Sequence, residues 1–532
     1  MGQTIFTNRS KRGTGYVLFI ILIFFSPFSL NHCSGQIQPQ TRIRVQKTTT
    51  STLEYCTFFG GMDGSENGLG TAISNDGSYY LTGVTSSEDF PTVHAFNNTY
   101  GGRDVFVSKF AANNTLCWST YLGGSDLEYA NDIAVASDGS CYVTGVTWSS
   151  NFPLKNAFNA TFGGGLDVAT DAFLSKFATN GTLLWSTYLG GVNWDEAHGI
   201  AVGSDDNCYV TGVTSSMNFP TEDAFDSTLG GIYDVFISKF NPDGTLLWST
   251  YLGGEYGGDY GYDIVVASDD SCYVTGFTSS PDFPTQNALN DTYIGDWDTF
   301  ITKFSSTGSL LWSTFFGGSY WDEALSIAVG SDGSCYITGF TGSPDFPMIN
   351  AFNHTYGGSG DAFVVKLAKD GSLLWSTFLG GEGGDRGYDI AVTGDGSCYI
   401  VGETFSSDFP VQGVSNSTLG GGFDAFISKL SPTGALLWST FLGGDSSDRA
   451  HSVAVTSSGR CYIVGSTYSS DFPTTQNAYR NFPDDHTDAF VAIFVEPTKH
   501  NYGYFAFVAI IPIIIIPITI LVVRKKQNQI TK

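Results

Sequence analysis

Residues 118–124 read Trp-Ser-Thr-Tyr-Leu-Gly-Gly, and this stretch returns along the chain at nearly constant intervals. Close copies begin at Trp185, Trp248, Trp312, Trp375 and Trp438, and a divergent copy begins at Tyr55. Successive copies are 63, 67, 63, 64, 63 and 63 residues apart. Seven copies at such regular spacing indicate a repeat architecture.

Each repeat contains four short apolar runs. In the second repeat they are Ile133–Ala136, Cys141–Thr147, Asp171–Phe177 and Leu183–Leu189. Asp-Gly and Asn-Gly pairs between such runs are typical of hairpin turns. Four strands per repeat, seven times over, predict an all-β, seven-bladed β-propeller of four-stranded blades. A solenoid is the alternative, although solenoid repeats are usually shorter.

The repeat as a whole resembles a known family. Trp-Ser-Thr-Tyr-Leu-Gly-Gly is followed by Asp, Ile-Ala-Val, Asp-Gly-Ser-Cys-Tyr-Val-Thr-Gly and Phe-Pro, and this order resembles the SBBP-type β-propeller repeat. The resemblance covers roughly residues 55–495. It implies a propeller fold and frequent display on microbial cell surfaces, and it implies no particular reaction.

The order of strands within a blade predicts how the ring closes. We expect the innermost strands to begin near Thr71, Ile133, Ile200, Ile264, Ile327, Ile390 and Val453. The last repeat ends at Phe490–Phe494 without an outer strand, whereas Glu54–Phe59 is a spare outer strand at the other end. Glu54–Phe59 should therefore complete blade seven and remove a free sheet edge, so that residues 54–497 form the propeller.

The two ends of the chain predict a membrane-anchored protein. Residues 1–35 have a basic start, a short apolar run and small residues after it, which is typical of a secretory signal peptide. An uncleaved signal anchor is the alternative. Residues 504–523 carry no charge and precede Arg524-Lys525-Lys526, which predicts one transmembrane helix with residues 524–532 in the cytoplasm. Residues 36–53 and 498–503 are interpreted as linkers, and the propeller should be extracellular.

The charge and the sequons of the chain indicate which partners and modifications to expect. The formal net charge is -27, and a surface this acidic should repel nucleic acid. Seven sequons are candidates for N-glycosylation: Asn97, Asn113, Asn159, Asn180, Asn290, Asn353 and Asn416. Asp226 occupies the equivalent position in the third blade. Because Asn and Asp both form turns with their side chains, a turn-forming role is the alternative.

An acidic residue lies five positions before each expected innermost strand. These residues are Glu66, Glu128, Asp195, Asp259, Asp322, Asp385 and Asp448. A propeller would arrange them as a ring near the channel mouth, and such a ring is a candidate Ca²⁺ site. Capping of local backbone donors is the simpler interpretation, since the sequence has no clustered Asp-x-Asp-x-Asp loop. No other cofactor is indicated.

Two further sets recur in the blades. An Asp in the first turn, such as Asp205, accompanies a Lys late in the third strand, such as Lys239, and we expect ion pairs between them. Each long loop also carries Phe-Pro, and we interpret these Phe residues, such as Phe219, as plugs between blades.

Positions at which the repeats differ are more informative about function than positions that recur in every repeat. Aromatic residues gather in the connections of blades three to five: Trp194, Tyr256, Tyr260, Trp297, Tyr320 and Trp321. Aromatics beside carboxylates suit sugar rings or a protein partner, whereas local packing is the alternative. The sequence has no Gly-x-Ser-x-Gly, His-Glu-x-x-His or phosphate-binding loop. We therefore expect a cell-surface binding or adhesion propeller for carbohydrate or a surface protein, with an envelope spacer and a carbohydrate-active enzyme as alternatives.

Overall fold

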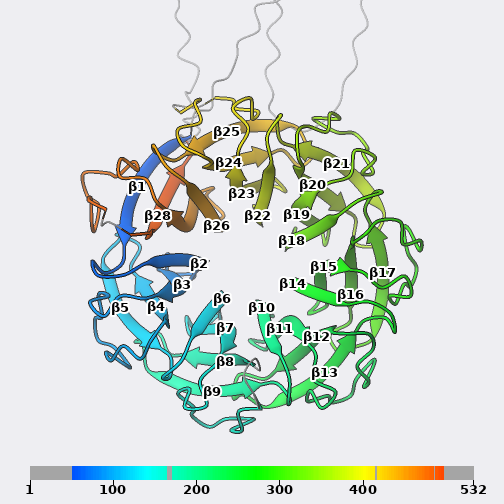
Figure 1. Ribbon diagram of the computed structural model, residues 1–532, viewed down its shortest axis with the longest axis horizontal. Coiled ribbons are helices and arrows are strands. Elements are labelled where there is room, and N and C mark those ends of the chain that lie inside the picture. Colours follow the sequence, from blue (N-terminus) through cyan, green and yellow to red (C-terminus); the bar gives the residue numbers. More distant parts are fainter. Residues whose placement is uncertain (1–50, 164–169, 414–415, 484–485, 497–532) are drawn as a thin grey trace, which may run out of the picture. The chain divides into compact units, whose positions relative to one another are not determined.

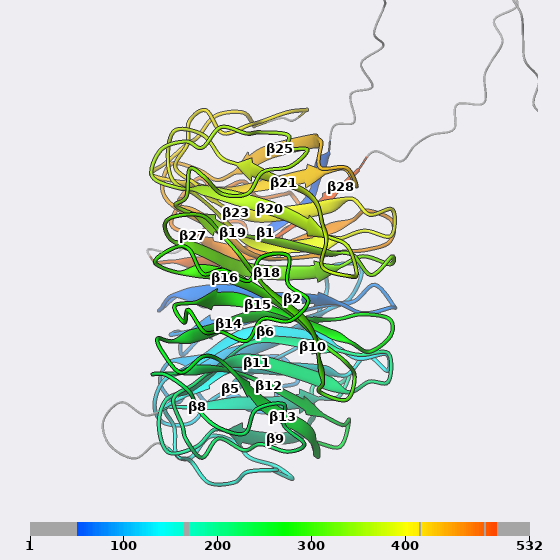
Figure 2. The same ribbon diagram turned by 90° about the vertical axis from the view of Figure 1, so that its right-hand side faces the viewer.

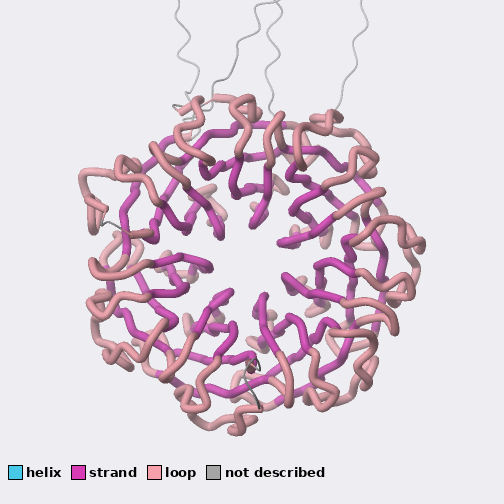
Figure 3. The backbone as a smooth tube through the Cα atoms, viewed as in Figure 1, coloured by secondary structure: helices cyan, strands magenta, loops and turns pink. Residues whose placement is uncertain are grey.

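The computed structural model describes residues 51–163, 170–413, 416–483 and 486–496. Within these ranges the chain forms 28 strands and no helix, and the strands make seven four-stranded antiparallel sheets. The sheets are arranged as blades around a central axis (Figure 1), and loops join the strands at both ends (Figures 2 and 3). The predicted seven-bladed β-propeller is therefore confirmed.

The innermost strands are β2 (Glu66–Ile73), β6 (Glu128–Val135), β10 (Asp195–Val202), β14 (Asp259–Val266), β18 (Asp322–Val329), β22 (Asp385–Val392) and β26 (Asp448–Val455). The second strands are β3 (Tyr79–Thr85), β7 (Cys141–Thr147), β11 (Cys208–Thr214), β15 (Cys272–Thr278), β19 (Cys335–Thr341), β23 (Cys398–Thr404) and β27 (Cys461–Thr467). The third strands are β4 (Asp104–Phe110), β8 (Asp171–Phe177), β12 (Asp234–Phe240), β16 (Asp298–Phe304), β20 (Asp361–Leu367), β24 (Asp424–Leu430) and β28 (Asp488–Val495). The outer strands are β5 (Leu116–Leu122), β9 (Leu183–Leu189), β13 (Leu246–Leu252), β17 (Leu310–Phe316), β21 (Leu373–Leu379), β25 (Leu436–Leu442) and β1 (Thr52–Phe59).

The ring closes as the repeat count predicts. Blade seven has the strand order β1-β28-β27-β26, so the first strand of the chain pairs with the last (Figure 1). The register pairs Phe58 with Phe490 and Cys56 with Ala492. This pairing covers the edge of β28, which would otherwise expose unpaired backbone groups.

The innermost strands begin five residues earlier than expected. β10 starts at Asp195 rather than at Ile200, and its pairing with β11 shifts between Ala197 and Gly199. The extra residue, His198, forms a bulge in the strand. The other six innermost strands shift at the equivalent place. Because a bulge interrupts the alternation of side chains, the first half of each strand does not stand out in the sequence.

Large apolar side chains fill the junctions between blades. Trp185 of β9 packs in one buried cluster with Phe219 and Phe236 of the next blade. The Trp185 Nε1 group also donates to the Pro242 carbonyl of that blade at 3.0 Å. Phe219 is 3% exposed and contacts the rings of Phe236 and Tyr251. The Phe of each Phe-Pro pair is thus a plug between blades, as predicted.

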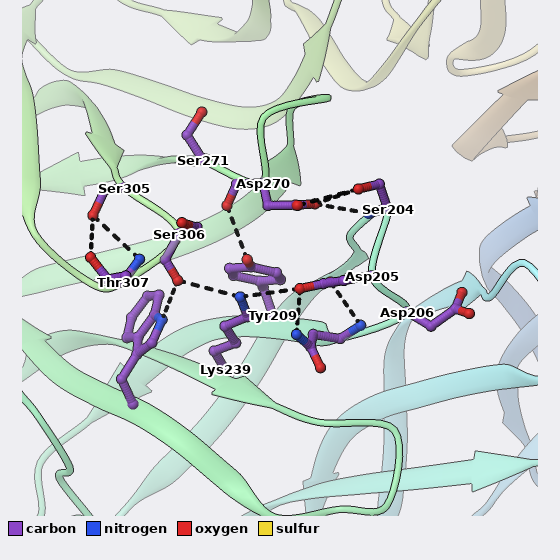
Figure 4. A network of polar contacts seen from close by, with 12 residues as sticks. Ser204, Asp205, Asp206, Tyr209, Lys239, Asp270, Ser271, Ser305, Ser306 and Thr307 are labelled. Atoms are coloured by element: carbon purple, nitrogen blue, oxygen red, sulfur yellow. Dashed lines mark hydrogen bonds and ion pairs between the residues drawn. The ribbon is translucent and has the colours of Figure 1, made fainter.

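Polar contacts join the blades at the face formed by the tight turns. Lys239 lies over the Tyr209 ring at 4.7 Å, and its Nζ is 3.6 Å from Asp205 Oδ2 (Figure 4). It also donates to the Ser306 carbonyl of the next blade at 3.3 Å. Of the six predicted ion pairs, the described residues form one other, Lys366–Asp332 at 4.0 Å, whereas Lys429 pairs with Glu496 and Asp269 with Lys369. The Lys–Tyr contact is more general, because six blades have it, and the sequence did not reveal it.

The described ranges contain no helix long and apolar enough to cross a membrane. The expected signal peptide (1–35) and linker (36–53), for all but its last three residues, lie outside the described residues. The juxtamembrane linker (498–503), transmembrane helix (504–523) and tail (524–532) also lie outside them. These assignments remain predictions.

Candidate functional site: the mouth of the central channel

The innermost strands place a distinct set of side chains around the channel. A cavity of about 100 Å³ lies among their fourth and fifth residues. The fourth-position residues that line it are Leu69, Asn131, His198, Tyr262, Leu325, Tyr388 and His451. This ring differs in every pair of neighbouring blades, whereas the repeat conserves most other positions. The channel lining is therefore one of the places where the blades differ.

An aromatic array runs across the ends of these strands in blades three to five. The ring centroids of Trp194 and Tyr260 are 6.1 Å apart, and Tyr260 stacks on Phe277 at 5.4 Å. Phe277 stacks on Trp297 at 4.5 Å, and Trp297 meets Trp321 edge-on at 5.0 Å. Four of the six predicted binding residues thus belong to one continuous array. We call these five residues the aromatic array.

The other two predicted binding residues do not join it. Tyr256 and Tyr320 are 67% and 57% exposed, and neither has a ring contact among the described residues. The sequence did not single out Phe277, which stands in β15 where the other blades have Val, Phe, Glu or Ser. A comparison of that strand position between repeats would have shown the substitution.

Charged residues continue the mouth into blades five to seven. Glu323 is 5% exposed and lies 3.9 Å from Arg386, which covers the Phe340 ring at 4.9 Å. Burial raises the pKa of Glu323, and the Arg386 charge opposes that shift. In the next blade Arg449 pairs with Glu403 at 2.5 Å. The mouth is thus aromatic on one side and lined by fixed ion pairs on the other.

Two histidines lie deeper in the channel wall. His198 contacts the rings of Tyr260 and Tyr262 at 4.8 and 5.7 Å. Burial lowers the pKa of His198, and burial together with Arg449 lowers the pKa of His451 to about 4. Both imidazoles are therefore neutral at pH 7 and can donate or accept hydrogen bonds.

Three carboxylates occupy the fifth position of the innermost strands of blades two, four and six. Each joins its own blade to the next one. Asp132 Oδ2 accepts from the Ile200 amide at 2.9 Å, and Asp263 Oδ2 accepts from the Ile327 amide at 2.8 Å. Asp389 Oδ2 accepts from the Val453 amide at 2.6 Å. Each Asp thus satisfies a backbone donor of the following blade. These residues have a structural function that explains why they are acidic.

The seven acids of the predicted calcium ring are buried rather than displayed at the mouth. Each begins an innermost strand and is at most 1% exposed. Asp195 is representative, because it accepts from the Gly191 amide at 2.7 Å, from Ser216 Oγ at 2.8 Å and from Thr214 Oγ1. The backbone contact is the capping that the simpler interpretation predicted. Among the described residues no group of three or more His, Cys, Asp or Glu is arranged to hold a metal ion.

The sequon residues of the long loops form turns. The Thr99 amide donates to Asn97 Oδ1 at 2.9 Å, and the Thr228 amide donates to Asp226 Oδ1 at the same distance. Asn159, Asn290, Asn353 and Asn416 form the same turn. Asn113 and Asn180 lie exposed in hairpin turns. A turn explains the Asn or Asp at the loop positions, and glycosylation remains a prediction.

Comparisons with known proteins agree with this fold. The beta-propeller repeat model SBBP matches residues 118–153 and 184–220. Regulatory protein FlaEY of Caulobacter vibrioides is 26% identical over 406 residues, which are 72% of this chain and 41% of that protein. An uncharacterized WD repeat-containing protein of Acanthamoeba polyphaga mimivirus is 22% identical over 440 residues, which are 69% of this chain and 31% of that protein. The chain therefore spans less than half the length of these two relatives.

Two solved structures match the chain at low sequence identity. Virginiamycin B lyase from Staphylococcus aureus with quinupristin matches with a TM-score of 0.46 at 9% identity, over 83% of this chain and 99% of that one. Sqt1 from Chaetomium thermophilum matches with a TM-score of 0.41 at 8% identity, over 84% of this chain and all of that one.

Seven four-stranded blades closed by a strand from the opposite end of the sequence define a seven-bladed β-propeller. Within that class, two stretches of the chain match the SBBP beta-propeller repeat.

Proposed function

We propose that the propeller is a binding module that recognises a carbohydrate at the channel mouth. The aromatic array carries this proposal, because it is continuous over three blades and departs from the repeat. Trp321 is 39% exposed, and Trp194, Tyr260 and Trp297 are partly exposed. Exposed aromatic faces offer flat apolar surfaces, and Trp and Tyr also carry a polar group.

The charged side of the mouth complements a polyhydroxylated ligand. Glu323–Arg386 and Glu403–Arg449 present acceptors and donors at fixed positions. Because each charge is already paired, these groups can hydrogen-bond a neutral sugar without leaving a buried charge uncompensated. A surface protein as ligand, an envelope spacer and a carbohydrate-active enzyme are the other outcomes that the experiment distinguishes.

Glycan-array binding followed by titration of the positive glycans tests this proposal. We expect Trp194→Ala and Trp321→Ala each to weaken binding by at least about tenfold, because buried aromatic anchors commonly contribute more than about 1.4 kcal/mol. Tyr468→Ala is the matched control. The exposed fraction of Tyr468 is 60%, similar to the 57% of Tyr320. Tyr468 has no ring contact within the described part of the chain. Circular dichroism checks that each variant folds.

The outcomes separate the alternatives. Equal affinity of the array variants and the control would refute a site at the mouth. Absence of binding to every glycan would favour a protein partner or a spacer. Turnover of a bound glycan, seen as released sugar, would favour an enzyme.

We also propose that the propeller acts outside the cell, anchored through residues 504–523. The apolar segments at 1–35 and 504–523 support this location. Protease added to intact cells should remove the propeller and leave a short membrane-bound C-terminal fragment. Full protection of the propeller until the membrane is lysed would contradict it.

A further inference from the structure

Two carboxylates from neighbouring blades meet at the junction of blades three and four. Asp234 begins the third strand β12, and Asp259 begins the next innermost strand β14. Both are at most 1% exposed. A Cβ placed on Gly253 would lie 2.4 Å from Asp234 Oδ1 and 2.7 Å from Asp259 Oδ2, so both carboxylates pack against the same glycine.

The junction of blades five and six repeats this geometry. Asp361 begins β20 and Asp385 begins β22. A Cβ on Gly380 would lie 2.5 Å from Asp361 Oδ1 and 2.6 Å from Asp385 Oδ2. The first Gly of the repeated Gly-Gly pair is therefore required by the carboxylates that crowd over it.

The chain leaves one oxygen of each third-strand acid unsatisfied at these two junctions. Asp234 Oδ2 accepts from the Gly230 amide at 2.8 Å, and Asp361 Oδ2 accepts from the Gly357 amide at 2.9 Å. Oδ1 of both is buried and has no hydrogen-bond partner among the described residues, which include the whole loop before each strand. Buried polar atoms without partners are rare and costly.

Two other junctions satisfy the equivalent oxygen with backbone amides. Asp298 Oδ1 accepts from Gly295 at 3.0 Å, and Asp424 Oδ1 accepts from Gly421 at 3.3 Å. Asp104 and Asp171 resemble Asp234, because Oδ1 of each is also buried without a hydrogen-bond partner among the described residues. Six residues of the loop before Asp171 lie outside the described ranges. The unsatisfied oxygen is thus a property of particular junctions and not of the repeat.

At the junction of blades seven and one the chain supplies a cation. Arg480 forms an ion pair with Asp488, the first residue of β28, and donates to the Gly61 carbonyl at 2.6 Å. Arg480 precedes Asp488 by the same number of residues as Asp226 precedes Asp234 and Asn353 precedes Asp361. No Lys or Arg of the described ranges forms an ion pair with Asp234 or Asp361.

The backbone at these three positions is the same. The amides of Arg480, Asp226 and Asn353 donate to Thr57, Thr250 and Thr377 Oγ1 at 2.9, 2.8 and 2.9 Å. Arg480 therefore shows what a cation at this location contacts: the third-strand carboxylate and the carbonyl of the second Gly. The equivalent carbonyls are those of Gly254 and Gly381.

We propose that the Asp234–Asp259 and Asp361–Asp385 junctions each bind one calcium ion. Ca²⁺ is a hard cation that takes oxygen ligands from carboxylates, backbone carbonyls and waters. Two carboxylates and one carbonyl supply such ligands here, and fewer than three acids per site are needed when waters complete the shell. Each ion would tie one blade to the next, in the place that Arg480 occupies elsewhere.

Isothermal titration of the chelator-treated full chain with CaCl₂ at physiological ionic strength tests the proposal. We expect two ions per chain, or up to four if Asp104 and Asp171 behave alike, and a rise in Tm. Asp226→Arg and Asn353→Arg should place a guanidinium at each junction, so each should remove one ion and the double variant two, with cooperative unfolding retained. Asp234→Asn should remove the same ion as Asp226→Arg.

Asp243→Arg is the control, because it makes the same charge change in an exposed hairpin turn of blade three and should leave the stoichiometry unchanged. The proposal is overturned if no calcium binds at about 1 mM, the weak end of the range for extracellular calcium modules. It is also overturned if both Arg variants keep the wild-type stoichiometry. The two proposals are tested separately. A failure to bind glycans would not count against calcium binding at the junctions, and a failure to bind calcium would not count against carbohydrate binding at the channel mouth.

Discussion

At the scale of single residues, space rather than backbone conformation accounts for the repeated Gly-Gly pair. A Cβ on Gly123 would lie 2.1 Å from Asp104 Oδ1 and 2.6 Å from Glu128 Oε2. A Cβ on Gly124 would lie 2.4 Å from the Cβ of Ser149. Asp104 and Ser149 are distant from these glycines in the sequence, so the repeat shows that glycine is needed but not why.

Gly123→Ala should therefore destabilise the propeller by about 1–3 kcal/mol, as is typical when a side chain is forced into a packed site. Urea unfolding monitored by tryptophan fluorescence measures the change. Gly394→Ala is the matched control, since a Cβ there meets nothing within 4 Å. It should change the free energy of unfolding by less than about 1 kcal/mol. Equal losses in the two variants would show that crowding is not the cause.

At the scale of elements, the outer three strands of each blade could be predicted and the innermost one only in part. Strands such as β11 have continuous apolar runs between turn residues, and counting them was enough to assign β1 to blade seven. The bulge at His198 hides the start of β10, because it breaks the alternation that marks a half-buried strand. A similar limit applies to the candidate site. Trp194, Trp297 and Trp321 stand out because they lie in loops, whereas Phe277 lies inside a strand and was missed.

The buried Phe219 between two blades leads to a prediction about packing. Phe219→Ala should cost about 3–5 kcal/mol, because it opens a cavity between two sheets that cannot collapse onto each other. Phe225→Ala is the control in the same loop. Phe225 is 43% exposed and contacts Phe304 edge-on, so its loss should cost less than about 1.5 kcal/mol. Thermal unfolding by calorimetry compares them, and similar Tm shifts would contradict the assignment of Phe219 as a plug.

At the scale of the whole molecule, the channel carboxylates couple the ring to pH. Burial raises the pKa of Asp263 to about 7, and the neighbouring charge of Asp389 adds to the shift. The folded protein thus holds this proton more tightly than the unfolded chain, whose Asp pKa is about 3.9. The resulting stability is fully present below about pH 4 and is lost as the pH rises to about 7.

Asp263→Asn should accordingly flatten the decline of stability between pH 5 and 7. One such carboxyl accounts for at most about 1.4 kcal/mol per pH unit. Urea midpoints measured at several pH values give the slope for each protein. Asp370→Asn should leave the slope unchanged, because Asp370 is exposed and hydrogen bonds from Ser372 lower its pKa. Parallel slopes for Asp263→Asn and wild type would refute a contribution from the channel.

The three channel carboxylates form an alternating pattern in a ring that has an odd number of blades. Asp132, Asp263 and Asp389 stand on blades two, four and six, and each reaches forward to the odd-numbered blade that follows. Seven is odd, so an every-second-blade pattern cannot run around the ring without a fault. The fault falls at blades seven and one, which are neighbours and have Ser452 and Gly70 at this position rather than Asp. Ser452 Oγ accepts from the Thr71 amide at 3.2 Å. The fault adjoins blade seven, the blade in which β1 pairs with β28 without a direct chain connection, so the ring has both irregularities in neighbouring places.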